Sequence, residues 1–148
     1  YYRTTQKNRS SLTNLQARKI LNEKDTLMSV IYENTNIRIE VESSEIPWLK
    51  IFTQHPYKEM SEVPGLVKFE IYDLLDTIEK EMLSYYKPKK INIASFGNYV
   101  PHVHWHIMAR FEGDSFFPEP MWGTKQRESD LNLADFEVFC KRVVDAIS

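Results

Sequence analysis

The sequence has little cysteine, no long apolar run and no excess of charge of one sign. Its 148 residues include one cysteine, Cys140, so no internal disulfide can form and a reducing, cytoplasmic setting is favoured. The longest apolar runs span about three or four residues, far below the roughly 20 that cross a bilayer. The N-terminal stretch also lacks the apolar segment of a signal peptide. We therefore expect a soluble protein with no membrane partner.

The charged residues are nearly balanced. Nineteen Lys and Arg residues stand against 21 Asp and Glu residues, which leaves a formal net charge of −2. A surface so close to neutral does not attract nucleic acid or anionic lipid over a broad area, so no nucleic-acid partner is expected. Any phosphate that this protein binds must be held at a local site.

The length of the chain suits one domain with one hydrophobic core. Residues 1–28 are polar and rich in Arg, Lys, Asn, Thr and Ser, with one weakly amphipathic stretch that is compatible with a short helix. We interpret residues 1–28 as an N-terminal appendage and residues 29–148 as the single domain.

Short runs with a period of two predict a mainly antiparallel sheet. The most regular run has Ile37, Ile39 and Val41 alternating with charged residues, and it is followed by a turn at Ser43–Glu45. A second hairpin turns at residues 96–99. The strands expected from these patterns cover residues 37–41, 48–53, 91–95 and 103–111.

Two helices are expected from apolar residues that recur every three or four positions. The main helix follows Ser61 as its N-cap, with Pro64 near its first turn, and stops before Pro88. The C-terminal helix runs from about residue 133 to 147, with Ser129, Asp130 or Asn132 available as caps. The order of elements predicts an α+β fold with helices on one face of the sheet. The aromatic loop at 113–123 is expected to pack, either over a pocket or at a dimer contact.

Three of the four histidines lie within five positions, at His102, His104 and His106. Residues i, i+2 and i+4 of a strand share one face, so these imidazoles are expected to point the same way. The interleaved residues are apolar and are expected to face the helices. Exposed strand faces more often carry Thr, Lys or Glu, so the cluster indicates a functional site.

Two kinds of chemistry fit these histidines. Imidazole is the commonest metal ligand, but three residues in line on one strand cannot complete a tetrahedral site without a ligand from another element. The only other histidine is His55, and it precedes a proline. In the alternative, the middle imidazole attacks phosphorus while its neighbours fix its tautomer and assist the leaving group. The geometry favours nucleophilic catalysis without a metal.

Residues 101–108, PHVHWHIM, match the pattern His-φ-His-φ-His-φ-φ, in which φ is apolar. The chain therefore resembles the histidine triad family of nucleotide-binding hydrolases and transferases over roughly residues 30–112. The strand–turn–strand at 91–100 is similar to the family's phosphate-loop hairpin, and Arg110 follows the triad as in many members. Segments 44–48 and 117–123 resemble a bacterial subgroup.

The resemblance implies a role for each histidine. His104 would form a covalent nucleotidyl intermediate at the α-phosphorus, and His106 would hydrogen-bond a phosphate oxygen or the bridging atom. His102 would brace the other two histidines. Many members carry a fourth, supporting histidine on an earlier strand, whereas residues 47–50 here are Pro-Trp-Leu-Lys. Support for His102 must therefore come from elsewhere.

The resemblance also implies a set of substrate-binding groups. Asn98 and the backbone N–H groups from Gly97 to Val100 would hold phosphate, and Asn92 would reach phosphate or ribose. Either Glu40 or Glu42 would bind the ribose, with Glu42 preferred. A base would lie against apolar residues, for which Ile37, Ile39 and Trp48 are candidates.

These implications define the expected function. The resemblance implies a homodimeric hydrolase that cleaves a purine nucleotide at its α-phosphorus, the substrate being a nucleoside phosphoramidate or a dinucleoside polyphosphate. No cofactor is required, although Mg²⁺ bound to a polyphosphate substrate is compatible with the scheme. The alternatives are a nucleotide-binding sensor without significant turnover and a metal-dependent enzyme built on the same histidines.

Overall fold

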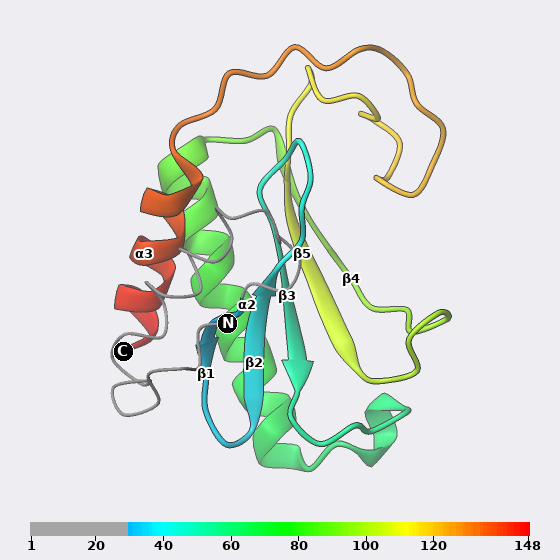
Figure 1. Cartoon of the computed structure of the whole chain (residues 1–148), viewed down its shortest axis with the longest axis vertical. Helices are drawn as coiled ribbons and strands as arrows, with labels where there is room; N and C mark the ends of the chain where they lie inside the picture. The colour runs from blue at the N-terminus through cyan, green and yellow to red at the C-terminus, as the bar shows by residue number, and fades with distance from the viewer. Residues whose placement is uncertain (1–29) are drawn as a thin grey trace, which may run out of the picture.

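A computed structural model describes residues 30–148, so the expected N-terminal appendage lies outside the described residues. The described part is an α+β domain, as the sequence pattern predicts (Figure 1). None of its helices is long and apolar enough to cross a bilayer. Its elements are β1 (Val30–Glu33), β2 (Ile37–Val41), β3 (Trp48–Thr53), the 3₁₀ turn η1 (Met60–Glu62), α2 (Gly65–Tyr86), β4 (Lys90–Ala94), β5 (His104–Arg110) and α3 (Phe136–Ile147).

The strands form one antiparallel sheet of five strands in the order β1-β2-β3-β5-β4. The two expected hairpins are present as β2–β3 and β4–β5. β1 is not predicted by the sequence pattern, because the four residues Val-Ile-Tyr-Glu contain no polar alternation that marks a strand. β3 pairs with β5 so that Lys50 lies opposite His106 and Phe52 lies opposite His104.

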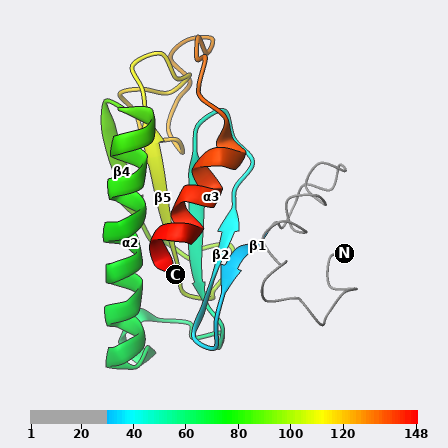
Figure 2. The ribbon, with the colours of Figure 1, turned by 90° about the vertical axis from the view of Figure 1, so that its left-hand side faces the viewer.

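The two helices pack against each other and cover one face of the sheet (Figure 2). The apolar residues expected for the main helix are its buried residues: Val67, Ile71, Leu74, Leu75, Ile78 and Met82. They meet alternate residues of the strands, including Ile39, Ile51 and Ile107, each of which has no exposed surface. The alternation therefore separates a helix-covered face from a face without helices.

Several predicted boundaries differ from the observed ones. α3 begins at Phe136, and its cap is Asp135, whose carboxylate accepts the N–H of Glu137 at 2.8 Å. Ser61 lies inside η1, and Pro64 stands before the first residue of α2. β5 begins at His104, one residue later than expected, because the preceding segment leaves the ladder to form the turn that contains Pro101.

Candidate active site

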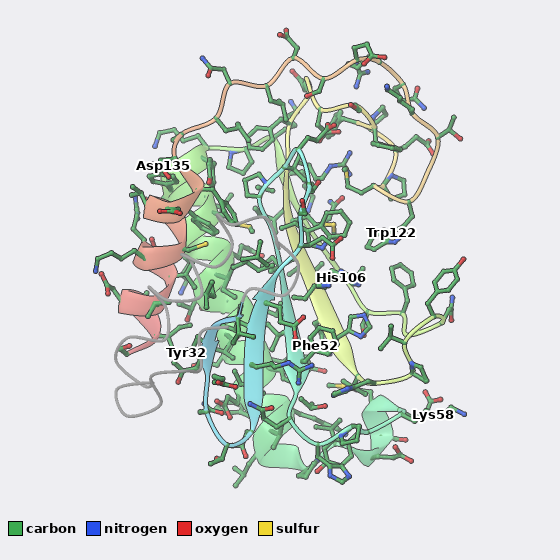
Figure 3. The ribbon with its side chains drawn as sticks, in the orientation of Figure 1. Tyr32, Phe52, Lys58, His106, Trp122 and Asp135 are labelled. Atoms are coloured by element: carbon green, nitrogen blue, oxygen red, sulfur yellow. The ribbon has the colours of Figure 1, made fainter. Side chains whose placement is uncertain are left out.

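The face of the sheet without helices carries the candidate site. The alternation along β5 turns His104 and His106 to this face, and each ring has only 8% of its surface exposed. Phe52 on β3 stacks on His104 with the ring centroids 4.6 Å apart. Figure 3 shows Phe52 on β3 and His106 on the neighbouring strand β5, with Trp122 on the loop that follows β5.

The hydrogen-bond partner of His104 determines which of its ring nitrogens is free. Its Nδ1 lies 2.7 Å from the carbonyl oxygen of His102. A carbonyl only accepts, so Nδ1 carries the proton and donates it to this bond. The neutral ring then has an unprotonated Nε2, which is the form that a nucleophilic imidazole requires.

His106 has the opposite tautomer. Its Nδ1 lies 3.0 Å from the indole Nε1 of Trp48, and an indole N–H only donates. Nδ1 of His106 is therefore the acceptor, and the proton of the neutral ring is on Nε2. Burial, together with repulsion from His104 when that ring is protonated and from Lys50, lowers the pKa of His106 to about 4. At neutral pH the two imidazoles thus offer one nucleophile and one hydrogen-bond donor.

His102 lies outside β5, so the expectation that one strand presents all three histidines holds only for the other two. Its Nε2 lies 2.6 Å from the carbonyl of Thr53 at the end of β3, and its ring edge contacts Phe52. Its own carbonyl accepts from Nδ1 of His104. Thr53 thus supplies the support that no fourth histidine provides, and His102 connects the end of β3 to His104.

A cleft of about 340 Å³ opens beside the two histidines. One wall is the turn between β4 and β5, in which Gly97 adopts a positive φ of 86° that favours glycine. The hydroxyl of Ser95 donates to the carbonyl of His104 at 2.6 Å and ties the start of this turn to the triad. The complete lining is Phe96, Gly97, Asn98, Tyr99, Val100, His104, His106 and Trp122. The expected phosphate-binding residues Gly97, Asn98 and Val100 therefore share one cleft with both catalytic candidates.

The loop after β5 supplies Trp122, the opposite wall of the cleft. The indole contacts the rings of His106, Phe96 and Trp48 at centroid distances of 5.0, 4.8 and 5.3 Å. Trp122 nevertheless stays 49% exposed. Of the two roles expected for this loop, the described chain thus shows packing over the pocket.

A buried ion pair holds this loop in place. Arg110, 2% exposed, donates from Nε and Nη2 to the carboxylate of Asp114 at 2.9 and 3.0 Å. Burial alone would raise the pKa of Asp114, but the guanidinium and three backbone N–H groups outweigh it and lower that pKa. A second anchor joins Glu45 to Ser115, whose N–H and hydroxyl both donate to the carboxylate.

The other residues predicted to bind the nucleotide do not line this cleft. The side-chain oxygen of Asn92 accepts from Arg110 at 2.8 Å, so it helps to hold the loop anchor. Glu42 pairs with Lys50 at 2.7 Å and lines a second cavity of about 360 Å³ near the start of α3. Ile37 and Ile39 are fully buried under the helices, so the expectation that they cradle a base is wrong.

Three aromatic residues of the site were not assigned their observed roles by sequence reasoning. Trp48 is expected from the sequence only as a base contact, yet its indole N–H donates to His106, 58 positions away. Phe52 stacks on His104, and Trp122 lines the cleft. A period-of-two signal exists for two of them, because Trp48 and Phe52 alternate with the buried Leu49 and Ile51 and therefore share the face of the histidines.

Within residues 30–148, no group of three or more His, Cys, Asp or Glu side chains is arranged to hold a metal ion. Of the two histidines that line the cleft, His104 presents an unprotonated Nε2, whereas the lone pair of His106 is on Nδ1 and accepts from Trp48.

The fold and the site together define a small α+β domain with paired imidazoles in a ligand cleft. A family model described as the HIT domain matches residues 23–113, more than half of the chain. The chain belongs to the HIT domain family. Membership of this family supports nucleotide binding.

Solved structures share the fold. A histidine triad protein from Bradyrhizobium japonicum is 24% identical with a TM-score of 0.68, covering 87% of this chain and 95% of its own. A histidine triad protein from Sinorhizobium meliloti 1021 is also 24% identical, with a TM-score of 0.65 and coverages of 86% and 93%. A hypothetical histidine triad nucleotide-binding protein from Sulfolobus tokodaii strain7 is 12% identical, with a TM-score of 0.55 and coverages of 86% and 88%. A comparison with curated proteins finds no match.

Proposed function

We propose that this protein is a nucleotidyl hydrolase or transferase that cleaves its substrate at the α-phosphorus through a covalent intermediate on His104. The observation that carries the proposal is the pair of opposite tautomers in one cleft. Nε2 of His104 has a free lone pair because its Nδ1–H is held by the carbonyl of His102. Nε2 of His106 has a proton because its Nδ1 accepts from Trp48.

The reaction has two displacements. In the first, Nε2 of His104 bonds to the α-phosphorus and the bond from phosphorus to the leaving group breaks. In the second, water attacks phosphorus, the bond to Nε2 breaks, and a nucleoside monophosphate leaves with the water oxygen. An amine leaving group takes a proton from solvent as it departs in the first step, and the water consumed in the second step returns that proton to solvent. In transfer, another acceptor replaces that water.

The neighbouring groups stabilise charge during these steps. His106 donates a hydrogen bond from Nε2 to the bridging atom or to a phosphate oxygen, and being neutral it does so without losing its proton. Asn98 and the backbone N–H groups between Gly97 and Val100 bind the non-bridging oxygens, which gain charge during attack. Removal of one such donor costs about 3 kcal/mol of transition-state stabilisation.

The nucleoside is the least constrained part of the proposal. Asn92 and Glu42 remain candidates for ribose or phosphate contacts, each after exchange of its present partner, Arg110 or Lys50. A purine nucleotide is the proposed substrate, attached to an amine or to a further phosphate chain. The related Sulfolobus protein, which is described as nucleotide-binding, supports the choice of substrate class.

The test is turnover with adenosine phosphoramidate and diadenosine polyphosphates, each with and without a chelator, followed by mass spectrometry of the quenched protein. We expect adenosine monophosphate as product, activity in the chelator with the phosphoramidate, and a mononucleotide adduct on His104. The His104→Ala variant is expected to lose both turnover and adduct. Binding without turnover would support the sensor alternative, and activity lost to the chelator but restored by zinc would support the metal-dependent one.

We further propose that two copies of the chain form a homodimer through α2 and the sheet edge at β4. α2 leaves Leu66, Phe69 and Tyr72 exposed by 84%, 71% and 51%. Their spacing of three residues puts them along one side of the helix. β4 ends the order of strands, and its Ile93 is 42% exposed. Exposed apolar side chains beside an unpaired strand edge are typical of an interaction surface.

The oligomeric state tests this second proposal without reference to activity. Light scattering of the full chain after size-exclusion chromatography is expected to give twice the mass of one chain. Phe69→Glu introduces a charge in the middle of the apolar helix side and is expected to give monomers. The control Asp76→Ala alters an exposed residue of the same helix, paired only with Lys80, and is expected to stay dimeric. A monomeric parent protein would contradict the proposal.

A further inference from the structure

The indole of Trp48 is the only described hydrogen-bond partner of the His106 ring. The two rings meet edge to face, with centroids 5.7 Å apart, and the donor and acceptor nitrogens are 3.0 Å apart. Trp48 is 8% exposed and is packed against Ile46 and Met108, so its ring cannot turn away without disturbing that cluster. The N–H of Trp48 is thus a fixed donor aimed at one nitrogen of His106.

We infer that Trp48 is a positioning residue that fixes the tautomer of His106, so that its Nε2–H points into the cleft. The inference rests on the proposed function, in which that N–H binds the bridging atom or a phosphate oxygen. A free imidazole exchanges its proton between the two nitrogens, and the form with Nδ1–H would present a lone pair to an anionic substrate. The fixed indole excludes this form, because two N–H groups would then face each other.

The indole also keeps His106 neutral. Protonation of Nδ1 would break the bond to Trp48, so this bond stabilises the neutral ring. The titratable groups nearest His106 are His104 on β5 and Lys50 on β3, which pairs with Glu42, while the exposed Tyr99 lines the same cleft. Burial, His104 when it is protonated and Lys50 act in the same direction and lower the pKa of His106 to about 4. Trp48 is the neighbour that determines which nitrogen of His106 carries the proton.

The covalent structure of the indole identifies an exchange at residue 48 that keeps the donor to His106. In the five-membered part of the indole, Nε1 occupies the ring position that Nε2 occupies in an imidazole. A histidine at residue 48 would therefore carry its donor at the same distance along the side chain. Trp48→His is a conservative exchange in hydrogen bonding although it removes a six-membered ring, whereas Trp48→Phe keeps an aromatic ring and removes the donor.

The decisive experiment is long-range ¹H–¹⁵N NMR of the histidine rings at rest, without substrate. The parent protein is expected to show His106 protonated on Nε2 alone. Trp48→Phe is expected to show a mixture of tautomers and a raised pKa of His106, and Trp48→His to restore the single tautomer. Trp122→Phe is the matched control, because Trp122 contacts the same ring by packing alone. It is expected to leave tautomer and pKa unchanged.

The turnover of adenosine phosphoramidate is then measured for the same variants. Trp48→Phe is expected to lower kcat about 10- to 100-fold, the usual effect of losing a residue that orients a working histidine. Trp48→His is expected to recover most of that loss. A single Nε2–H tautomer in Trp48→Phe would overturn the inference whatever the activity. A parent protein with the expected tautomer but no turnover would instead contradict the proposed function and leave the tautomer assignment standing.

Discussion

The two faces of the sheet are built from alternate residues of the same strands, yet they are buried in different ways. Ile107, with no exposed surface, lies under the helices, and its neighbour His106, 8% exposed, lies under aromatic rings and a loop. On the helix face the buried side chains are mainly aliphatic. On the other face, Nδ1 of His104 and Nδ1 of His106 each have a specific hydrogen-bond partner, which lowers the cost of burying the imidazoles.

Similar burial therefore has different consequences on the two faces of the sheet. The apolar face stabilises the fold through area removed from water, and it tolerates exchange of one aliphatic side chain for another. On the histidine face, function depends on which ring nitrogen donates a hydrogen bond and which accepts one. Substitutions on the two faces should therefore separate activity from stability.

The largest expected effect is that of His104→Ala on turnover. Loss of the nucleophile is expected to lower kcat by about 10⁴-fold or more, since the other groups cannot form the covalent intermediate. Stability is expected to fall by about 1–3 kcal/mol, because the carbonyl of His102 loses its donor. Steady-state kinetics and urea unfolding of the same preparation measure both quantities.

The control on the other face is Ile107→Ala. It opens a cavity under the helices and is expected to cost about 2–5 kcal/mol of unfolding free energy. Because the histidines keep their partners, kcat at a temperature where the variant is folded is expected to stay within about threefold of the parent. A kcat loss in Ile107→Ala as large as in His104→Ala would remove the distinction between the faces.

The next effect concerns the loop that closes the histidine face. Asp114→Asn breaks the buried pair with Arg110, leaves the guanidinium without a counter-charge and is expected to cost about 3–5 kcal/mol. Asp130→Asn, at an exposed position of the same loop, is expected to stay within about 0.5 kcal/mol of the parent. Chemical unfolding measures both. Equal stabilities of the two variants would show that the buried pair does not hold the loop.

A third prediction uses pH. The pKa of His106 is lowered from 6.5 to about 4 in the folded state, so the unfolded chain takes up this proton first as the pH falls. This group therefore contributes stability above pH 6.5 that is lost between pH 6.5 and about 4. At about 1.4 kcal/mol for each pH unit, the loss totals roughly 3 kcal/mol. His106→Gln is expected to flatten the stability profile in that window.

Lys50→Met sharpens the same measurement. It removes one of the positive charges that lower the pKa of His106, so that pKa rises and the stability loss ends at a higher pH. Unfolding free energies at intervals of half a pH unit give the three profiles. A His106→Gln profile as steep as the parent's would show that another group causes the acid destabilisation.

The fold was largely accessible from the sequence because its signals are local. Period-two alternation places β2 and β3, and the three- and four-residue spacing gives the buried side of α2. β1 carries no alternation, and the cap of α3 depends on the turn that precedes it, so these local patterns were insufficient. The helix and strand types were predictable, while ends set by tertiary contacts were not.

The site was only partly predictable for a related reason. Side chains alternate between the faces of a strand, so the sequence alone predicts that the two strand histidines share a face. The partner of each ring nitrogen does not follow from any local pattern. Trp48 meets His106 across 58 positions, and Trp122 reaches it only because Arg110 and Asp114 fold the loop back. The shared face of the candidate catalytic histidines His104 and His106 is thus encoded locally, whereas their tautomers depend on contacts made by the fold.

The smallest expected effect tests how the loop serves the cleft. Trp122 is half-exposed and contacts His106, while Arg110 and Glu45 hold the loop by bonds that do not involve the indole. Trp122→Leu should therefore leave the loop in place and remove only a wall of the substrate cleft. Since an aromatic contact contributes about 1 kcal/mol, KM is expected to rise about three- to tenfold with kcat within about twofold. Urea unfolding is expected to change by less than about 1 kcal/mol. A stability loss comparable to that of Asp114→Asn, with KM unchanged, would instead make Trp122 part of the loop's support, and the histidine face would then be closed by packing as the helix face is.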